Sequence, residues 1–123
     1  MAKEIVVKTQ KATHYVYSSD QKSDIPTIFL HGFTGSHRSW DEIVSKSNLL
    51  TITLDLPGHG KSTFNNLESD YSIDDWCEDF NEILNSLDID KIDLCGYSMG
   101  GRLAISFATK YPGKINKLIL INI

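Results

Sequence analysis

The residues best suited to chemistry surround Ser98, which lies between two glycines in the stretch "GYSMG", residues 96–100. An apolar run precedes this stretch and a helical pattern follows it, as expected where a sharp turn between strand and helix presents a serine nucleophile. Glycines on both sides allow strand and helix to approach closely, because they carry no Cβ. Two interpretations are open for Ser98: a reactive hydroxyl pushed out of a sheet, or an ordinary N-terminal helix cap.

Two backbone N–H groups could stabilise negative charge that develops beside Ser98. The N–H of Met99 lies at the N-terminus of the predicted helix, where free donors and the helix dipole favour an anion. The N–H of Phe33 follows the apolar run that ends in "LHG", and the second donor of such a site comes from a loop of this kind. We predict that Phe33 and Met99 form an oxyanion hole. The alternative for the Phe33 loop is a simple turn between a strand and a helix.

The residue that bears most on substrate class is Arg102, which shares a helix face with Ser98 one turn earlier. A cation in the first helical turn opposes the helix dipole, at a cost of roughly a few tenths of a kcal/mol or more. A guanidinium group can grip a carboxylate bidentately. Arg102 therefore indicates a small-molecule carboxylate substrate, and the alternative is a surface arginine. Tyr97 is either a pocket wall or a core residue.

Other polar residues are expected to play structural parts. The stretch "DLPGHGKS", residues 55–62, emerges at the carboxyl edge of the predicted sheet, and we interpret Asp55 and His59 as shaping this loop through hydrogen bonds. His14 and His37 have no supporting pattern and are expected at exposed positions. Two cysteines lie in apolar patterns without metal-ligand spacing and are expected to be buried thiols in a reducing compartment; they are Cys77 and Cys95.

The elements that must position these residues alternate between strands and helices. Strands are expected over residues 4–9, 13–18, 26–32, 49–56, 91–96 and 117–123, and helices over residues 36–46, 72–87 and 98–109. In the clearest helix, Ser72 is the expected N-cap, and the Asp75 carboxylate three residues later is expected to complete a capping box with it. Its apolar stripe consists of Ile73, Trp76, Cys77, Phe80, Leu84 and Leu87. The alternation from Pro26 onward predicts an α/β domain with a mostly parallel sheet and flanking helices.

Length and charge exclude several classes of protein. The 123 residues suffice for one domain, and 41% hydrophobic with 23% charged residues is typical of a globular protein. A formal net charge of -4 provides no basic field for nucleic acid. The sequence contains no apolar run long enough for a bilayer and no signal-peptide pattern at its start, so we expect a cytoplasmic protein without a membrane partner. Nothing indicates its oligomeric state.

Together, "HGFTGS", "DLPGHG", "GYSMGGR" and Trp40 resemble the motifs of the α/β-hydrolase superfamily over nearly the whole chain from about Pro26. The arginine directly after "SMGG" is most similar to the branch that forms 2-succinyl-6-hydroxy-2,4-cyclohexadiene-1-carboxylate in menaquinone biosynthesis. That resemblance implies a carbon–oxygen lyase that eliminates pyruvate without metal or organic cofactor. Ser98 would be the base, Phe33 and Met99 the oxyanion donors, and Arg102 the ligand of a substrate carboxylate.

A serine hydrolase of the same fold is the alternative activity. Carboxylesterases and C–C bond hydrolases share the remaining motifs. In such an enzyme Ser98 would attack a carbonyl carbon and form an acyl-enzyme.

The catalytic triad of this fold follows the chain order Ser, then Asp or Glu, then His. After Ser98 the sequence contains no aspartate, glutamate or histidine. We therefore expect residues 1–123 to be the N-terminal half of an α/β-hydrolase domain, without the lid and the C-terminal strands. Such a fragment is expected to be inactive by itself. Its last strand would be an exposed apolar edge, which predicts poor solubility.

Overall fold

The computed structural model of the chain describes residues 3–65 and 70–123. Its strands are β1 (Lys3–Lys8), β2 (Ala12–Ser18), β3 (Thr27–Leu30), β4 (Thr51–Asp55), β5 (Thr63–Phe64), β6 (Ile92–Tyr97) and β7 (Ile115–Ile121). Its helices are α1 (Asp41–Lys46), α2 (Ile73–Ser86) and α3 (Met99–Lys110), with 3-10 turns η1 (His37–Trp40) and η2 (Pro112–Lys114). The predicted alternation is confirmed. The short β5 was not predicted, and the helix expected over residues 36–46 opens as the 3-10 turn η1, where Ser36 and Ser39 form a capping box.

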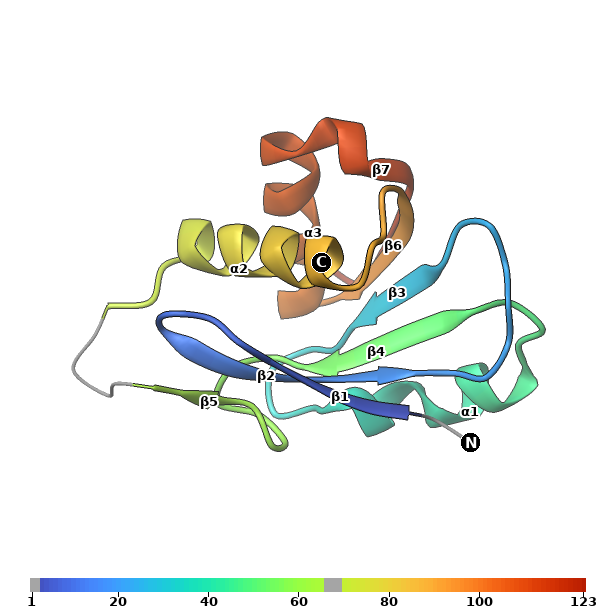
Figure 1. Cartoon of the computed structure of the whole chain (residues 1–123), viewed down its shortest axis with the longest axis horizontal. Coiled ribbons are helices and arrows are strands. Elements are labelled where there is room, and N and C mark those ends of the chain that lie inside the picture. Colours follow the sequence, from blue (N-terminus) through green and yellow to red (C-terminus); the bar gives the residue numbers. More distant parts are fainter. Residues whose placement is uncertain (1–2, 66–69) are drawn as a thin grey trace.

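The strands form one sheet in the order β1-β2-β4-β3-β6-β7, and β5 pairs with β2. Strand β2 runs antiparallel to β1 and β4, whereas β4, β3, β6 and β7 are parallel to one another. From β3 the chain therefore continues to β4 on one side and later to β6 on the other side (Figure 1). Open α/β sheets bind ligands at the carboxyl ends of the strands where the order reverses. In this sheet that place is the end of β3.

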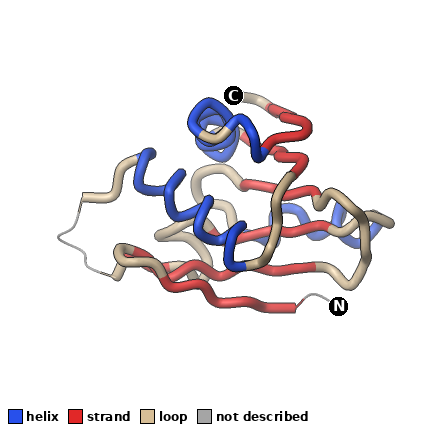
Figure 2. The backbone as a smooth tube through the Cα atoms, turned by 45° about the horizontal axis from the view of Figure 1, so that its top comes forward, coloured by secondary structure: helices blue, strands red, loops and turns tan. Residues whose placement is uncertain are grey.

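Alternating side chains of β3 enter two separate cores. Ile28 and Leu30 belong to the larger core, which α2 and α3 cover together on one face of the sheet (Figures 1 and 2). Phe29 points to the opposite face and packs against Trp40, with ring centroids 4.8 Å apart, beside Val44 of α1. Coverage on both faces explains why the sequence of this strand is an almost continuous apolar run.

Helix α2 begins as the sequence predicts. Ser72 accepts a hydrogen bond from the Asp75 N–H, and Asp75 accepts one from the Ser72 N–H. The buried stripe of the helix consists of Trp76, Cys77, Phe80, Ile83 and Leu84. Ile73 was wrongly expected on this stripe: it is 51% exposed, because it occupies the first helical position, one turn before the stripe begins. Within the described residues, no helix is long and apolar enough to cross a membrane.

A buried polar cluster connects β2 with α2. The His14 side chain is fully buried, and its Nε2 lies 2.9 Å from Oδ2 of Asp79. The same oxygen accepts hydrogen bonds from the hydroxyl groups of Thr9, at 2.7 Å, and Tyr71, at 2.8 Å. The expectation that His14 is exposed was therefore wrong. Its partner, Asp79, lies on a helix that is distant in the sequence, and a local sequence pattern does not indicate such a contact.

This cluster predicts a loss of stability in acid. Burial raises the pKa of Asp79. Hydrogen bonds from His14, Thr9 and Tyr71 together lower it by more than burial raises it, so the net pKa lies below the ordinary 3.8. A carboxyl whose folded pKa lies below its unfolded pKa stabilises the fold above the unfolded value, and this contribution disappears as pH falls through the folded value. The pH range in which the Asp79 contribution to stability is lost therefore lies below about pH 4. Asp79→Asn is expected to lower the free energy of unfolding by about 2 kcal/mol at pH 7.

The pH dependence of that difference is the measurement. Denaturant melts of the wild type and Asp79→Asn at pH 7, 4 and 3 should show the gap narrowing below about pH 4, as the wild-type carboxyl becomes protonated. Glu82→Gln, an exposed change on the same helix, is the control and should leave stability unchanged at each pH. A gap that stays constant down to pH 3 would contradict the prediction.

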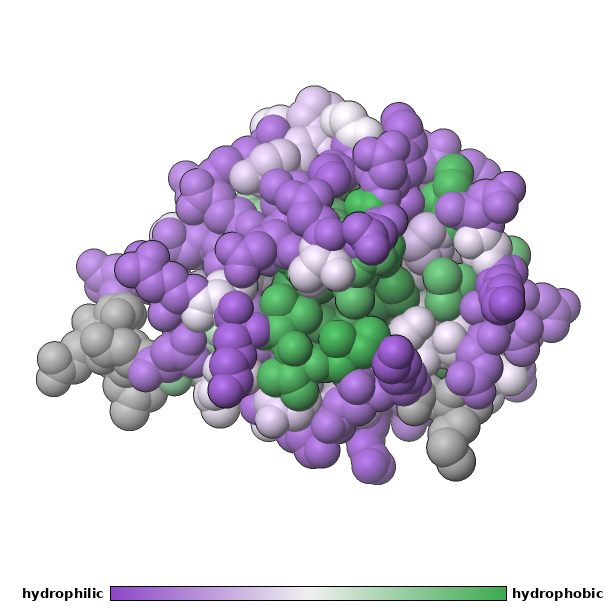
Figure 3. Space-filling model, viewed as in Figure 1, coloured by the Kyte–Doolittle hydropathy of each residue, from purple (hydrophilic) through white to green (hydrophobic). Residues whose placement is uncertain are grey.

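Strand β7 is exposed on both faces. Leu118 and Leu120 are each 38% exposed, and Ile119, which points to the opposite face, is 45% exposed. The exposed apolar edge expected from the sequence is confirmed, whereas poor solubility stays a prediction. Apolar side chains also gather next to α2 and over the strands on the face shown in Figure 3, with polar residues around them. Both cysteines of the chain are buried free thiols, as expected.

Candidate active site

Ser98 occupies a strained turn between β6 and α3. Its backbone angles are φ 53° and ψ −114°, a combination that side-chain-bearing residues rarely adopt. The backbone is held on both sides, because the Ser98 N–H donates to the Ile121 carbonyl at 3.0 Å and the Ser98 carbonyl accepts from the Gly101 N–H at 2.9 Å. Among the described residues the Ser98 side chain makes no capping hydrogen bond. The interpretation of Ser98 as an ordinary helix cap is therefore wrong.

Two glycines make this turn possible. A Cβ on Gly96 would lie 2.7 Å from the carbonyl carbon of Gly100, where the end of β6 meets the first turn of α3. A Cβ on Gly100 would press against the carbonyl oxygens of Leu30 and His31 at the end of β3. Both glycines are thus required by close backbone approach, as the sequence pattern predicted.

A third glycine places the Phe33 loop beside the turn. A Cβ on Gly32 would lie 2.9 Å from Cδ2 of Tyr97 and 3.3 Å from Cβ of Ser98. The loop continues as a tight turn, in which the Gly35 N–H donates to the Gly32 carbonyl at 3.0 Å and Thr34 takes a φ of 68°. The N–H of Phe33 therefore lies in a loop that contacts Ser98.

Both predicted oxyanion donors are available. Across residues 3–65 and 70–123, neither the Phe33 N–H nor the Met99 N–H has a hydrogen-bond acceptor. The Phe33 side chain is 74% exposed, so the loop presents its aromatic ring to solvent. Met99 is the first residue of α3, where the helix leaves its N–H without an internal partner.

His31 fixes the start of the Phe33 loop, a role that sequence reasoning missed. Its Nε2 accepts the Leu56 N–H at 3.0 Å, so the ring proton resides on Nδ1, which donates to the Gly32 carbonyl at 2.7 Å. Burial is the largest cause that lowers the pKa of His31, and the neutral ring is thereby favoured. The "HG" pair directly before Phe33 was the available signal.

A cavity of about 440 Å³ opens beside the Phe33 loop. Phe33, Tyr97 and Trp40 line it, together with Ile121 at the end of β7. Tyr97 is 43% exposed, which excludes the core interpretation and leaves the pocket wall. The structure therefore brings Phe33 and Tyr97 together around one hollow at the carboxyl edge of the sheet. Ser98 does not line this hollow, but it follows Tyr97 directly and lies against Gly32 of the Phe33 loop.

Arg102 and Met99 differ from Phe33 and Tyr97 in their surroundings, since neither lines the cavity of about 440 Å³. Arg102 is exposed on the next turn of α3, and its guanidinium forms no hydrogen bond or ion pair within the described part of the chain. The Met99 side chain lines a smaller cavity of about 130 Å³ toward α2, with Leu103 and Trp76. The Arg102 guanidinium is thus available to a ligand that reaches over the N-terminus of α3.

At the end of β4 one expectation is confirmed, and for His37 of η1, which contacts this strand end, another is wrong. Asp55 and His59 shape the loop after β4, as predicted: Asp55 accepts from the Lys61 N–H at 3.0 Å, and Nδ1 of His59 lies 3.3 Å from the Pro57 carbonyl oxygen. His37 was wrongly expected to be exposed. Its ring bonds to the buried carboxylate of Asp55, a partner that local sequence does not reveal. Within the described residues, no group of three or more His, Cys, Asp and Glu could hold a metal ion.

Comparison with known proteins agrees with this geometry. A sequence model of the alpha/beta hydrolase fold matches residues 26–123. The chain is 44% identical over 96 residues to a Bacillus subtilis (strain 168) protein that carries the provisional name 2-succinyl-6-hydroxy-2,4-cyclohexadiene-1-carboxylate synthase, covering 76% of this chain and 34% of that protein. It is 35% identical over 111 residues to mouse epoxide hydrolase 4, covering 89% of this chain and 31% of that protein.

A solved structure supports the same fold. An epoxide hydrolase from Vigna radiata superposes with a TM-score of 0.86 at 20% sequence identity, and the match covers 99% of this chain and 40% of that one. The chain spans about a third of the length of the Bacillus subtilis and mouse relatives. The strained serine turn, the parallel sheet and these matches lead to one conclusion: the chain belongs to the α/β-hydrolase-fold family.

Proposed function

We propose that the protein containing this chain is a lyase that releases pyruvate and forms 2-succinyl-6-hydroxy-2,4-cyclohexadiene-1-carboxylate. The observation that carries the proposal is the Arg102 guanidinium, exposed one helical turn beyond Ser98 and unpaired among the described residues. It suits a small substrate with carboxylate groups. The name of the Bacillus subtilis relative supports the same activity. We also propose a cytoplasmic location, with neither nucleic acid nor membrane as partner.

In this mechanism Ser98 acts as a base. Its Oγ takes a proton from a substrate carbon, and the electron pair moves toward a substrate carbonyl, whose oxygen becomes negative. The N–H groups of Phe33 and Met99 stabilise that oxyanion. When the electron pair returns, a C=C bond forms and a C–O bond breaks, so that the leaving group departs as the enolate of pyruvate. This enolate takes up the proton and becomes pyruvate. Arg102 holds a substrate carboxylate during these steps.

Ser98 needs a histidine held by a carboxylate to gain this basicity. No histidine or acid follows Ser98 in these residues, so we propose that both partners are encoded beyond Ile123 and that residues 1–123 alone are inactive. The nucleotide sequence after the Ile123 codon tests this directly. An open frame that encodes an Asp or Glu and then a His supports the proposal. A stop codon there would leave Ser98 without a base and refute it.

Serine hydrolase activity is the second candidate. The N–H groups of Phe33 and Met99, which have no acceptor among the described residues, suit the tetrahedral oxyanion of acyl transfer equally well. This candidate predicts turnover of simple aryl esters and a covalent acyl-Ser98 adduct detectable by mass. The lyase predicts pyruvate release without such an adduct.

Substitution of Arg102 separates the two candidates. In the whole gene product, Arg102→Ala is expected to lower kcat/KM for pyruvate release about 10²-fold, because a charge-assisted bidentate contact of roughly 3 kcal/mol is lost. Lys110→Ala removes a positive charge from the last turn of the same helix and is expected to leave kcat/KM unchanged. Unchanged pyruvate release in Arg102→Ala would remove the main reason for the lyase.

A further inference from the structure

We propose that His37, together with Asp55, positions the loop that carries the Phe33 N–H. His37 is a positioning residue here, since it acts on the reaction only through the loop. The inference rests on the proposed function in one respect: it requires Phe33 to donate to an oxyanion at Ser98. It applies equally to the lyase and the hydrolase.

The anchor is the Asp55 carboxylate, which is fully buried at the end of β4. Its Oδ1 accepts the His37 backbone N–H at 2.8 Å and lies 2.8 Å from Nδ1 of the His37 ring. Its Oδ2 accepts the Lys61 N–H at 3.0 Å and the Tyr17 hydroxyl at 3.1 Å. Oδ1 of Asp55 therefore accepts hydrogen bonds from the end of the Phe33 loop, and Oδ2 accepts them from the loop after β4 and from strand β2.

The charge state of Asp55 determines the direction of the ring contact. Burial raises the pKa of Asp55. Hydrogen bonds from the N–H groups of His37 and Lys61 and from the His37 ring together lower it by more, so its net pKa lies below the ordinary value. An ionised carboxylate only accepts hydrogen bonds. Nδ1 of His37 is therefore the donor, and both His37 contacts pull the loop toward Asp55.

The Phe33 loop is attached to the sheet at both ends by histidines. At its start, His31 accepts the Leu56 N–H, and at its end His37 donates to Asp55, the residue directly before Leu56. The remaining hydrogen bonds of residues 32–36, within the described part of the chain, are local ones to residues 31–39. The position of the Phe33 N–H is thus set by two consecutive residues of β4 and its loop.

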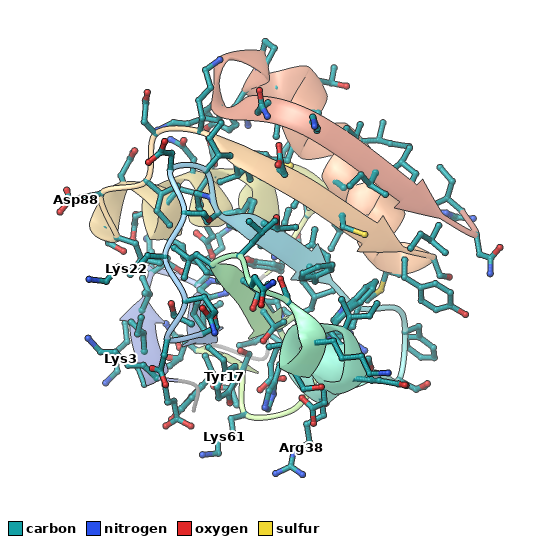
Figure 4. The ribbon with its side chains drawn as sticks, turned by 90° about the vertical axis from the view of Figure 1, so that its right-hand side faces the viewer. Lys3, Tyr17, Lys22, Arg38, Lys61 and Asp88 are labelled. Carbon is teal, nitrogen blue, oxygen red and sulfur yellow. The ribbon has the colours of Figure 1, made fainter. Side chains whose placement is uncertain are left out.

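The His37 ring is itself held in place. It stacks on the Tyr17 ring with centroids 3.6 Å apart and an interplanar angle of 17°. Figure 4 shows Tyr17 lying inward of Lys61 and Arg38, whose side chains extend away from the fold. Thr34, inside the loop, holds a positive φ of 68° that a non-glycine residue adopts at a cost. When the His37 ring contact is lost, the backbone N–H of His37 makes its one remaining hydrogen bond to Asp55 among the described residues, so the turn can relax and carry the Phe33 N–H with it.

The test measures how fast Ser98 reacts with a fluorophosphonate in the whole gene product. In this reaction the serine Oγ–P bond forms, the P–F bond breaks and fluoride leaves, while the Oγ proton passes to the proposed histidine base. A phosphonyl oxygen occupies the oxyanion hole. His37→Gln is expected to slow labelling about tenfold, since a displaced donor retains part of the 10²- to 10³-fold effect of an oxyanion donor. His37→Asn places an amide N–H donor at the position of Nδ1 and is expected to label within about twofold of the wild type.

A matched control separates positioning from general stability. Tyr17→Phe removes a hydrogen bond from the other oxygen of Asp55, so it is expected to lower the melting temperature without slowing the labelling. Slow labelling in His37→Gln with recovery in His37→Asn supports the inference. Equal slowing in Tyr17→Phe and His37→Gln, or wild-type rates in both His37 variants, overturns it. If the wild type labels no faster than Ser98→Ala, the proposed role of Ser98 fails and the inference fails with it.

Discussion

Ser98→Ala in the whole gene product is expected to lower pyruvate release by about 10⁴-fold or more, because loss of the reacting hydroxyl leaves only binding and oxyanion stabilisation. Ser98→Gly is expected to lose activity to the same extent. The two variants differ in stability, since Ser98 holds a φ of 53° and only glycine adopts such angles freely. Ser98→Gly should therefore unfold with a free energy about 1 kcal/mol higher than that of the wild type, whereas Ser98→Ala should match the wild type.

Two assays check these expectations. Pyruvate release is followed by a coupled assay, and the free energies of unfolding come from denaturant melts. Residual activity above about 1% of the wild type in Ser98→Ala would show that Ser98 is not the reacting group. Equal stability of Ser98→Gly and Ser98→Ala would contradict the strain argument and leave the catalytic argument intact.

Gly100→Ala is expected to destabilise the protein by about 4 kcal/mol or more, although helix propensity alone favours alanine over glycine by about 1 kcal/mol. The new Cβ would press against the carbonyl oxygens of Leu30 and His31. Backbone oxygens at the end of β3 cannot move aside as a flexible side chain can. The helix must shift away from the sheet, and the packing of its first turn is lost.

Gly113→Ala is the matched control for this prediction. A Cβ on Gly113 would meet nothing within 4 Å. The two changes add the same methyl group, so any difference between them reports the clash. Gly113→Ala is expected to stay within about 0.5 kcal/mol of the wild type in denaturant melts. A Gly100→Ala protein as stable as the wild type would show that α3 does not lie against β3 in this way.

The fold could be predicted from the sequence because each element is encoded locally. The apolar run of β3 and the reciprocal Ser72 and Asp75 cap need only a few neighbouring residues to be recognised. The turn at Ser98 was predictable for the same reason, since its glycines and serine are adjacent. Ile73 was misplaced because a periodic pattern does not reveal that the buried stripe begins only one turn into the helix, at Trp76.

The polar partners of the site could not be predicted, because they join distant parts of the chain. His37 lies 18 residues from Asp55, and His14 lies 65 residues from Asp79. Nothing around either histidine in the sequence signals a carboxylate. Only the packing of sheet, loops and helix brings each ring to its acceptor. Both histidines were therefore expected in solvent, whereas His14 is fully buried and His37 is partly buried against Asp55.

The placement of Phe33 has a consequence for how enzymes with this site can evolve. Its backbone supplies the proposed oxyanion donor, while its ring is 74% exposed and lines the cavity. Any residue except proline retains the N–H. The side chain at position 33 can therefore change under selection for new substrates, while the backbone N–H continues to stabilise the oxyanion. Saturation libraries at this position should return altered substrate preference among variants that keep their turnover.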